Sequence, residues 1–402
     1  MEKELSDFFQ GFLEKESLFS DKGALQAFFI PETIKHRDDQ KKKIADILAP
    51  SIKLEKPSNL FIYGKTGSGK TLTVKHLASQ LLQISEENNI PLKVIYINCK
   101  LKKATDTEYR LIAQLAREFD KAIPSTGLPT DEVYKAFFGA LDEKKQMVLL
   151  VLDEIDHLIK KTGDEILYNL TRINEELKNA QISLVGISND LLFIDSVDPR
   201  VKSSLSEEEV VFPPYNALQI QDILKQRAKL AFKQDALEEG VIEKCAAYSA
   251  REHGDARRAI DLLRVAAEIA ERECAKKITM THIDKSEEKI ERDRVADIVL
   301  VQPKQSQAVL YAILISCQKR NNSLFTGEIY DTYKTVCCKV GLIPLTQRRI
   351  SDIIAELDMF GIINAKVISK GRYGRTREIS LAAPQASIPG IKKAIEEGLA
   401  LS

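Results

Sequence analysis

The residues with the most specific chemical potential form a glycine-rich loop directly after a short apolar run, residues 59–63. The loop matches the pattern G-x-x-x-x-G-K-[ST], whose glycines let backbone N–H groups surround a polyphosphate. The residues placed at the phosphates are Gly64, Lys65, Thr66, Gly67, Ser68, Gly69, Lys70 and Thr71. Lys70 can reach the β- and γ-phosphates, and the Thr71 hydroxyl can bind Mg²⁺. A chance match is the alternative, but the strand-like run before the loop and the helical spacing after it favour a nucleotide site.

Two acidic residues, Asp153 and Glu154, directly follow the continuously apolar residues 147–152. In open α/β sheets, sites lie at the carboxyl ends of strands, so these carboxylates are expected beside the phosphates. We expect Asp153 to hold Mg²⁺, directly or through water, and Glu154 to orient or deprotonate the attacking water. The alternative is an acidic helix N-cap, a position that suits carboxylates in any case.

Three further polar residues are candidates for contacts with the γ-phosphate. Asn189 follows a strand-like run, although Asn is also ordinary in turns. Arg257 falls in the first turn of a helix that Asp255 can cap, where a cation opposes the helix dipole and so indicates an anionic partner. The alternative is a surface arginine paired with Asp255. Arg200 lies on a turn from which it could reach a phosphate bound by a neighbouring subunit, or it is an ordinary loop arginine.

Strand and helix patterns alternate around these residues, which predicts an α/β domain with a parallel sheet. The expected strands are residues 59–63, 94–97, 147–152, 182–187 and 209–212. From the two prolines at 213–214 to residue 298, only helical patterns are found, which indicates a small all-α domain. Residues 299–303 resemble a linker. We therefore expect a nucleotide-binding domain at 1–213, a helical lid at 214–298 and a third domain at 299–402.

The third domain has a helix-turn-helix order. Ile350, Ile353, Ile354 and Leu357 recur at the spacing of one buried helix face, and Thr346 can cap that helix. The start of this helix carries the candidate DNA-reading side chains Gln347, Arg348 and Arg349. A plain amphipathic helix with basic ends is the alternative.

A hairpin with a basic turn follows this helix. Its strands are expected at residues 363–368 and 377–381. The candidate DNA-binding residues of the turn are Lys370, Arg372, Tyr373, Arg375 and Arg377. Such a wing can place arginines on phosphates or in a minor groove. The alternative is a charged hairpin tip that protects a sheet edge.

The overall composition excludes few functions. Lys+Arg and Asp+Glu are both 59 in 402 residues, so the net charge indicates no anionic partner. The six cysteines include no C-x-x-C pair and none at zinc spacing from a histidine, which suits reduced thiols in the cytoplasm. No apolar run approaches the roughly 20 residues of a membrane span, and no signal sequence is visible.

Taken together, the motifs resemble those of AAA+ ATPases in order and spacing. The matching stretches are residues 64–71, 152–154, Asn189, residues 198–200 and residues 254–257. In that family they are Walker A, Walker B, sensor 1, the arginine-finger region and sensor 2. Residues 29–37, 198–205 and 254–259 resemble most the archaeal replication initiators related to the origin recognition complex large subunit and to cell-division-cycle-six.

The resemblance implies ATP/ADP and Mg²⁺ as cofactors and origin DNA as a partner. It places Ile34, His36, Arg37 and Tyr215 at the nucleotide, and a DNA-contacting helical insertion within residues 98–138. It implies a cytoplasmic, nucleoid-associated initiator that recruits or loads the MCM helicase, in contact with other initiator copies, with slow ATP hydrolysis acting as a switch. The alternatives are an ATP-switched winged-helix transcription regulator and a clamp-loader-like assembly factor.

Overall fold

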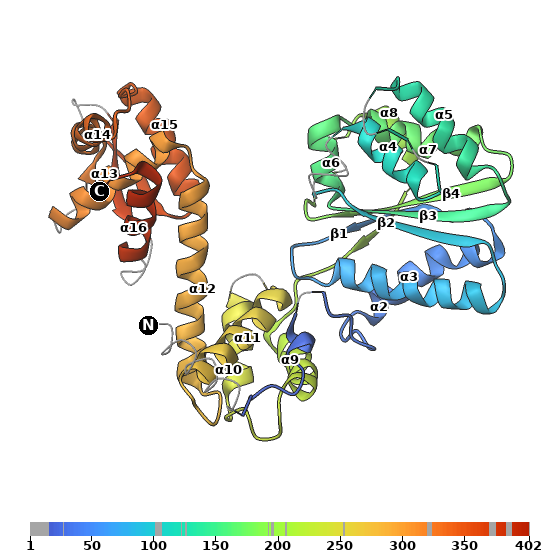
Figure 1. Ribbon diagram of the computed structural model, residues 1–402, viewed down its shortest axis with the longest axis horizontal. Coiled ribbons are helices and arrows are strands. Elements are labelled where there is room, and N and C mark those ends of the chain that lie inside the picture. Colours follow the sequence, from blue (N-terminus) through green and yellow to red (C-terminus); the bar gives the residue numbers. More distant parts are fainter. Residues whose placement is uncertain are drawn as a thin grey trace, which may run out of the picture. The chain divides into compact units, whose positions relative to one another are not determined.

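The computed structural model consists of two compact units, Met1–Arg264 and Val265–Ser402, which are described separately (Figure 1). The residues described are 16–26, 28–100, 107–121, 123–124, 127–191, 193, 197–205, 207–251, 254–319, 324–369, 375–382 and 388–401. Within these residues, no helix combines the length and the apolar character that a membrane span requires.

The first unit contains a five-stranded parallel sheet in the order β2-β3-β4-β1-β5. Its strands are β1 (Asn59–Tyr63), β2 (Leu92–Asn98), β3 (Gln146–Asp153), β4 (Ala180–Ser188) and β5 (Glu207–Val211). Every residue of β3 is buried, as expected for an interior parallel strand covered on both faces. The predicted α/β class is confirmed. Because β1, β3 and β4 end at one edge, the residues that follow them meet there.

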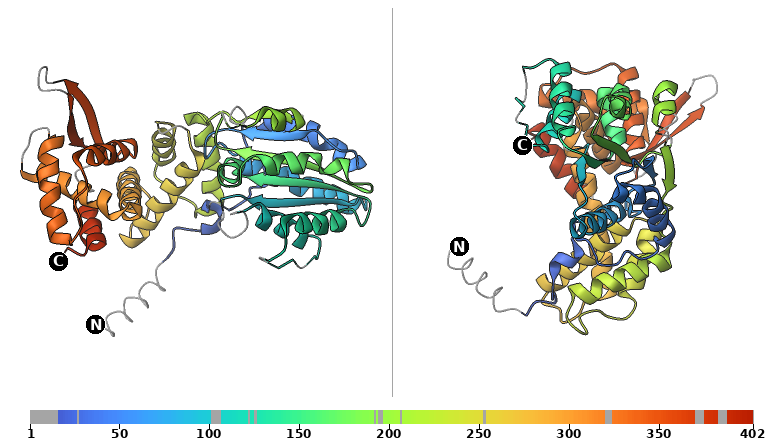
Figure 2. Two further views of the ribbon diagram at one scale, coloured as in Figure 1. Left: turned by 90° about the horizontal axis from the view of Figure 1, so that it is seen from above. Right: turned by 90° about the vertical axis from the view of Figure 1, so that its right-hand side faces the viewer.

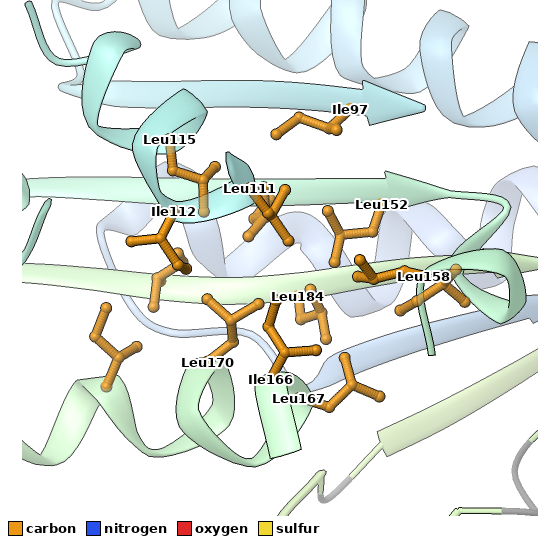
Figure 3. Packing of buried hydrophobic residues seen from close by; sticks show 14 of the residues in the cluster. Ile97, Leu111, Ile112, Leu115, Leu152, Leu158, Ile166, Leu167, Leu170 and Leu184 are labelled. Atoms are coloured by element: carbon orange, nitrogen blue, oxygen red, sulfur yellow. The ribbon is translucent and has the colours of Figure 1, made fainter. Parts of the chain in front are cut away.

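Helices cover both faces of this sheet (Figure 1). One face packs against α2 (Asp38–Leu48) and α3 (Lys70–Glu87). The other face packs against α4 (Glu108–Arg117), α5 (Thr130–Leu141), α6 (Ile155–Thr162), α7 (Glu165–Arg172) and α8 (Pro199–Leu205). Figure 3 shows Leu111 of α4 and Leu170 of α7 among the side chains that pack over β3 and β4. Short 3₁₀ helices are η1 (Lys22–Leu25), η2 (Ala49–Lys53) and η3 (Ile173–Glu175).

The first unit also contains the helices that follow the sheet. These are α9 (Ala217–Ala231), α10 (Val241–Arg251) and the beginning of α11 (Ala256–Arg272), which continues into the second unit. Asn216 and Gln219 form a capping box that sets the start of α9. An N-terminal strap, defined here as residues 17–36 without residue 27, lies along α9. At one end of the strap, the Phe19 and Phe232 rings stack at 5.3 Å between centroids.

The second unit has the helix and strand order of a winged helix. Its elements are α12 (Met280–Val301), α13 (Lys304–Lys319), β6 (Leu324–Phe325), α14 (Thr326–Val340), α15 (Gln347–Met359), β7 (Ile363–Ser369), β8 (Arg375–Leu381) and α16 (Ile388–Leu399). The strands form an antiparallel sheet in the order β6-β8-β7. Figure 2 shows β7 and β8 as a hairpin that extends from the helices of this unit.

The linker predicted at residues 299–303 is wrong. Helix α12 continues to Val301, and Val299 is completely buried in the core of the second unit. Burial of this side chain keeps the segment helical, and the helix ends only at Gln302, before Pro303.

Candidate functional site

The glycine-rich loop connects β1 to α3 at the carboxyl edge of the sheet. Its backbone is in close contact with two other segments. Gly64 faces the Phe212 carbonyl oxygen, which would lie 2.5 Å from an added Cβ. Gly67 has φ +70° and lies under Asp255, whose Oδ1 would be 1.7 Å from an added Cβ. The glycines at both positions are therefore required by close packing, and at Gly67 also by the left-handed backbone.

Lys70 is held at this loop by hydrogen bonds and is nearly buried, with 5% of its surface exposed. Its Nζ donates to the carbonyl oxygens of Gly64 (2.6 Å) and Lys65 (2.9 Å) and to Asn189 Oδ1 (2.9 Å). Burial lowers the pKa of Lys70 to about 8, although the nearby Asp153 carboxylate opposes this shift. The structure thus brings together Lys70, Asp153 and Asn189, which the sequence analysis had placed after three different strands.

The oxygen atoms next to Lys70 fit a magnesium ion. The Thr71 hydroxyl donates to Asp153 Oδ2 over 2.9 Å, so both predicted metal-binding residues are in contact. Hydroxyl and carboxylate oxygens are the ligands that Mg²⁺ prefers, together with water and phosphate oxygens. The Tyr96 hydroxyl also donates to Asp153 Oδ2, and burial raises the pKa of Tyr96. Sequence analysis missed Tyr96, although its position near the end of a predicted strand was a usable signal.

Glu154 has an unusual backbone conformation at the start of α6. Its φ is +56°, in the left-handed region that non-glycine residues adopt only at a cost of roughly 1–3 kcal/mol. Its Oε2 atom is buried without a hydrogen-bond partner among the described residues, and lies 3.6 Å from both Lys100 Nζ and His157 Nε2. A carboxylate that lines a pocket and has an oxygen without a hydrogen bond is suited to receive a proton or a water hydrogen.

Arg257 lies in the first turn of α11. Asp255 Oδ1 accepts hydrogen bonds from the backbone N–H groups of Arg257 (2.8 Å) and Arg258 (3.1 Å), so Asp255 caps this helix as predicted. The Ala256 N–H donates to the Gly67 carbonyl oxygen over 3.3 Å. This bond holds the start of α11 directly against the phosphate loop.

These residues share one pocket. Its polar lining includes the loop residues 66, 67 and 69–71 together with Asp153, Glu154, Asn189 and Arg257. Its apolar lining includes Phe29, Pro31, Ile34, Tyr215 and Ile223. Ile34 and Tyr215, which the resemblance placed at the nucleotide, thus line the same pocket as the phosphate loop.

His36 and Arg37 do not belong to the described lining of this pocket. His36 Nε2 lies 3.1 Å from Asp222 Oδ2 on α9. Arg37 is only 2% exposed, and its guanidinium donates to the carbonyl oxygens of Ser68 (2.9 Å) and Pro213 (2.6 Å). It also stacks on Tyr215, with Cζ 3.8 Å from the ring centroid. Arg37 thus connects the back of the phosphate loop to the chain that enters the lid.

Arg200 is also outside the pocket lining. Its side chain is 86% exposed and forms a salt bridge with Asp198, with 3.1 Å between Arg200 Nε and Asp198 Oδ1. The structure leaves its predicted role in a neighbouring subunit untested.

The predicted insertion within residues 98–138 contains α4 and the start of α5, and both helices pack on the sheet. Leu111 and Phe137 are completely buried in that core. Of the lysines at the start of this segment, Lys100 lies 3.6 Å from Glu154, whereas Lys102 and Lys103 lie outside the described residues.

The candidate DNA-reading helix is α15. The Thr346 hydroxyl accepts the Arg349 N–H and so caps it. Gln347, Arg348 and Arg349 are exposed, and Arg349 lies 3.7 Å from the Asp352 carboxylate. Arg377 has a structural partner, because its Nη1 donates to the Ser351 carbonyl and joins the hairpin to α15. Lys370, Arg372 and Tyr373 lie outside the described residues, as does the side chain of Arg375.

Three family models match successive parts of the chain. They are an AAA domain at residues 53–193, a Cdc6 AAA+ ATPase-type lid domain at residues 221–288, and a CDC6 C-terminal winged helix domain at residues 297–389. The ORC1-type DNA replication protein of Thermococcus onnurineus is 52% identical over 381 residues, which cover 94% of this chain and 91% of that protein. The chain belongs to the ORC1-type replication protein family.

Other members of the ORC1-type family agree with this assignment. The ORC1-type DNA replication protein 1 of Methanosarcina mazei is 50% identical over 382 residues, which cover 94% of this chain and 91% of that protein. Among solved structures, the Aeropyrum pernix ORC1 protein in complex with DNA is 41% identical, with a TM-score of 0.82, and the match covers 95% of this chain and 98% of that chain. The predicted AAA+ architecture and the predicted replication family are thus confirmed.

Proposed function

We propose that this chain is an ATP-dependent DNA-binding replication initiator that recognises replication origins. The observation that carries the proposal is the convergence of Lys70, Asp153, Glu154, Asn189 and Arg257 on one pocket, in a chain whose other unit is a winged helix. The membership of the ORC1-type family and the likeness to an ORC1 protein bound to DNA support the same conclusion.

In this proposal, the polar residues of the pocket bind the phosphates of ATP. The loop N–H groups and Lys70 surround the β- and γ-phosphates, and Arg257 contacts the γ-phosphate from the lid. Asn189 orients the attacking water or the γ-phosphate. Glu154 accepts a hydrogen of that water, and its Oε2, which has no hydrogen bond among the described residues, supports this role.

We assign the magnesium ion to Thr71 and Asp153, whose hydroxyl and carboxylate oxygens are in contact. When bound, the ion neutralises charge on the phosphate oxygens. Thr71 and Tyr96 both donate to Asp153 Oδ2 and so hold this carboxylate oxygen in place. To bind a metal, Oδ2 must release at least one of these two donors.

We further propose that hydrolysis is slow and acts as a switch. ATP contacts residues of both the sheet and the lid, so the γ-phosphate can bias how the start of α11 rests on Gly67. The second unit then binds duplex DNA through α15 and the hairpin. The proposal also holds that the chain helps to recruit or load the MCM helicase, that it works with other initiator copies through Arg200, and that it is cytoplasmic and nucleoid-associated. We propose domains at 1–213, 214–298 and 299–402. The boundary between residues 298 and 299 falls within α12.

Genome-wide footprinting of the protein on its host's DNA, with and without ATP, tests the proposed function. Binding at a few clusters of repeated sites that coincide with replication start sites is the expected result. Scattered binding at promoters, with none at replication start sites, would instead support a transcription regulator. A Lys70→Ala variant serves as the control for the effect of ATP in the same experiment.

A further inference from the structure

A second arginine, Arg227, lies almost buried in the lining of the proposed nucleotide pocket. It belongs to α9, is 5% exposed, and lines the pocket beside Phe29 and Ile223. Its Nη1 donates to the Ala24 carbonyl oxygen and its Nη2 to the Phe29 carbonyl oxygen, both over 3.2 Å. Its Cζ lies 4.6 Å from the centroid of the Phe29 ring. All of these contacts are with the N-terminal strap.

Arg227 carries its charge in this buried place without a carboxylate partner among the described residues. Burial lowers the pKa of its guanidinium, and no neighbouring charge offsets this shift. A buried cation with only carbonyl oxygens as partners is costly to keep, so a function that needs its particular geometry is the simplest explanation.

The contacts of Arg227 are the central part of a longer attachment between the strap and α9. At one end, the Ser20 N–H donates to the Ala231 carbonyl oxygen over 2.8 Å. On the other side of Arg227, the Gln226 amide donates to the Thr33 hydroxyl over 2.9 Å, and His36 pairs with Asp222. Arg227 is the attachment nearest to Phe29, and Phe29, Pro31 and Ile34 form the strap's side of the pocket.

We propose that Arg227 is a positioning residue for the base of the bound nucleotide. Through Ala24 and Phe29 it holds the strap against α9, so that the apolar wall that contacts a purine base is already formed when the nucleotide arrives. The proposal rests on the proposed nucleotide site. The phosphates are assigned to Lys70 of α3 and Arg257 of α11, and the contacts of Arg227 are with the strap, so Arg227 contributes to ATP binding and not to the binding of a ligand without a base.

Binding of ATP and of inorganic tripolyphosphate to the full chain, in the presence of Mg²⁺, separates these contributions. The test variant is Arg227→Met, which keeps the length and the apolar contact of the side chain while it removes the donors. ATP affinity is expected to fall about tenfold, and tripolyphosphate affinity to remain unchanged. Arg227→Lys is expected to recover part of the ATP affinity, because its ammonium can still donate to a carbonyl oxygen.

Three controls complete the experiment. Lys229→Met removes an exposed cation from the same helix and is expected to bind both ligands normally. Phe29→Ala removes part of the apolar wall itself and should also lose ATP selectively, while Arg227→Lys keeps the test of Arg227 valid if Arg227→Met does not fold. Lys70→Ala should weaken both ligands.

Unchanged ATP affinity in Arg227→Met, or equal losses for ATP and tripolyphosphate, would overturn the role of Arg227. Normal tripolyphosphate binding by Lys70→Ala would instead overturn the assignment of the phosphate loop, so the two failures are distinguishable.

Discussion

At the scale of single residues, hydrogen bonds fix the positions of the side chains in the pocket. Lys70 is bonded to Asn189 and to loop carbonyl oxygens, and Asp153 accepts hydrogen bonds from Thr71 and Tyr96. These bonds satisfy buried polar groups in the structure and must be exchanged when phosphates bind. The roles of these residues therefore depend on hydrogen bonds that can be exchanged, so substitutions and changes of pH are expected to alter ligand binding.

The lowered pKa of Lys70 predicts that ATP affinity depends on pH. In the free protein, Lys70 loses its proton above about pH 8. Bound phosphates favour the charged form and raise this pKa, so binding above pH 8 requires the uptake of a proton, while binding well below pH 8 does not. Affinity should therefore be constant below pH 8 and fall by up to about tenfold per pH unit above it.

Isothermal titration of the protein with ATP at pH 7 and pH 9, in buffers of different ionisation enthalpy, measures this proton uptake directly. Lys70→Arg, which stays charged at both pH values, is the matched variant and should show no uptake. Equal heats in all buffers for the unmodified protein at pH 9 would contradict the prediction.

Glu154→Gln is expected to bind ATP and to hydrolyse it at least 100-fold more slowly, because an amide cannot accept the proton of the attacking water. The measurement is phosphate release in a single turnover, together with ATP affinity. Asp190→Asn removes a carboxylate two residues beyond β4, and is the control expected to retain hydrolysis. Normal hydrolysis by Glu154→Gln would rule out the proposed role.

Arg37→Met is expected to lower the free energy of unfolding by about 1–3 kcal/mol, because it removes the donor from the buried hydrogen bond to the Ser68 carbonyl oxygen and from the partly buried one to the Pro213 carbonyl oxygen. Urea unfolding without nucleotide measures this change. A loss of ATP affinity without any change in stability would show instead that Arg37 contacts the nucleotide itself.

At the scale of elements, the strand order decides which loops meet. β1 lies between β4 and β5, and β4 is paired with β3, so the ends of β1, β3 and β4 form one edge although β2 and several helices separate them in sequence. In the second unit, α15 and the hairpin are joined by the bond between Arg377 and the Ser351 carbonyl. This bond makes the predicted DNA-reading helix and the predicted wing one structural element.

The wing prediction concerns Arg372 and Arg375. Their replacement by Gln should weaken DNA binding on all sequences and reduce the slope of log affinity against log salt concentration by about 0.9 for each lost phosphate contact. The double variant Lys392→Gln and Lys393→Gln on α16 removes an equal charge and is the control. A salt slope unchanged from the original protein would exclude these arginines from the DNA interface.

At the scale of the whole molecule, the pocket joins the sheet to the lid helices within the first unit. Its lining comes from the ends of β1, β3 and β4 and from α9 and α11, so ATP bound at the proposed site should stabilise that unit as one cooperative body. At 100 times the dissociation constant, ATP should add about 2.7 kcal/mol to the free energy of unfolding.

Thermal unfolding with increasing ATP tests this coupling, and Lys70→Ala is the matched control that should not respond. A rise in the unfolding temperature of the unmodified protein that the Lys70→Ala variant shares would show that ATP acts elsewhere on the molecule.

The sequence alone was enough to predict the α/β class, the glycine-rich loop, the two acidic residues at the end of β3 and the capped helix α15. Each of these depends on short-range patterns, such as apolar runs, glycine spacing or a capping residue, which a local reading detects. The same short-range patterns predicted a linker where α12 continues, because they contain no information on the burial of Val299 by residues far away in the chain.

Only the tertiary structure decided how the remaining residues act. Arg37 bonds to Pro213 and Arg227 bonds to Ala24, which are contacts between segments about two hundred positions apart. Tyr96 reaches Asp153 only because β2 pairs with β3. A residue's type limits the bonds that it can form, but its partners are set by the packing of distant segments, which no short stretch of sequence contains.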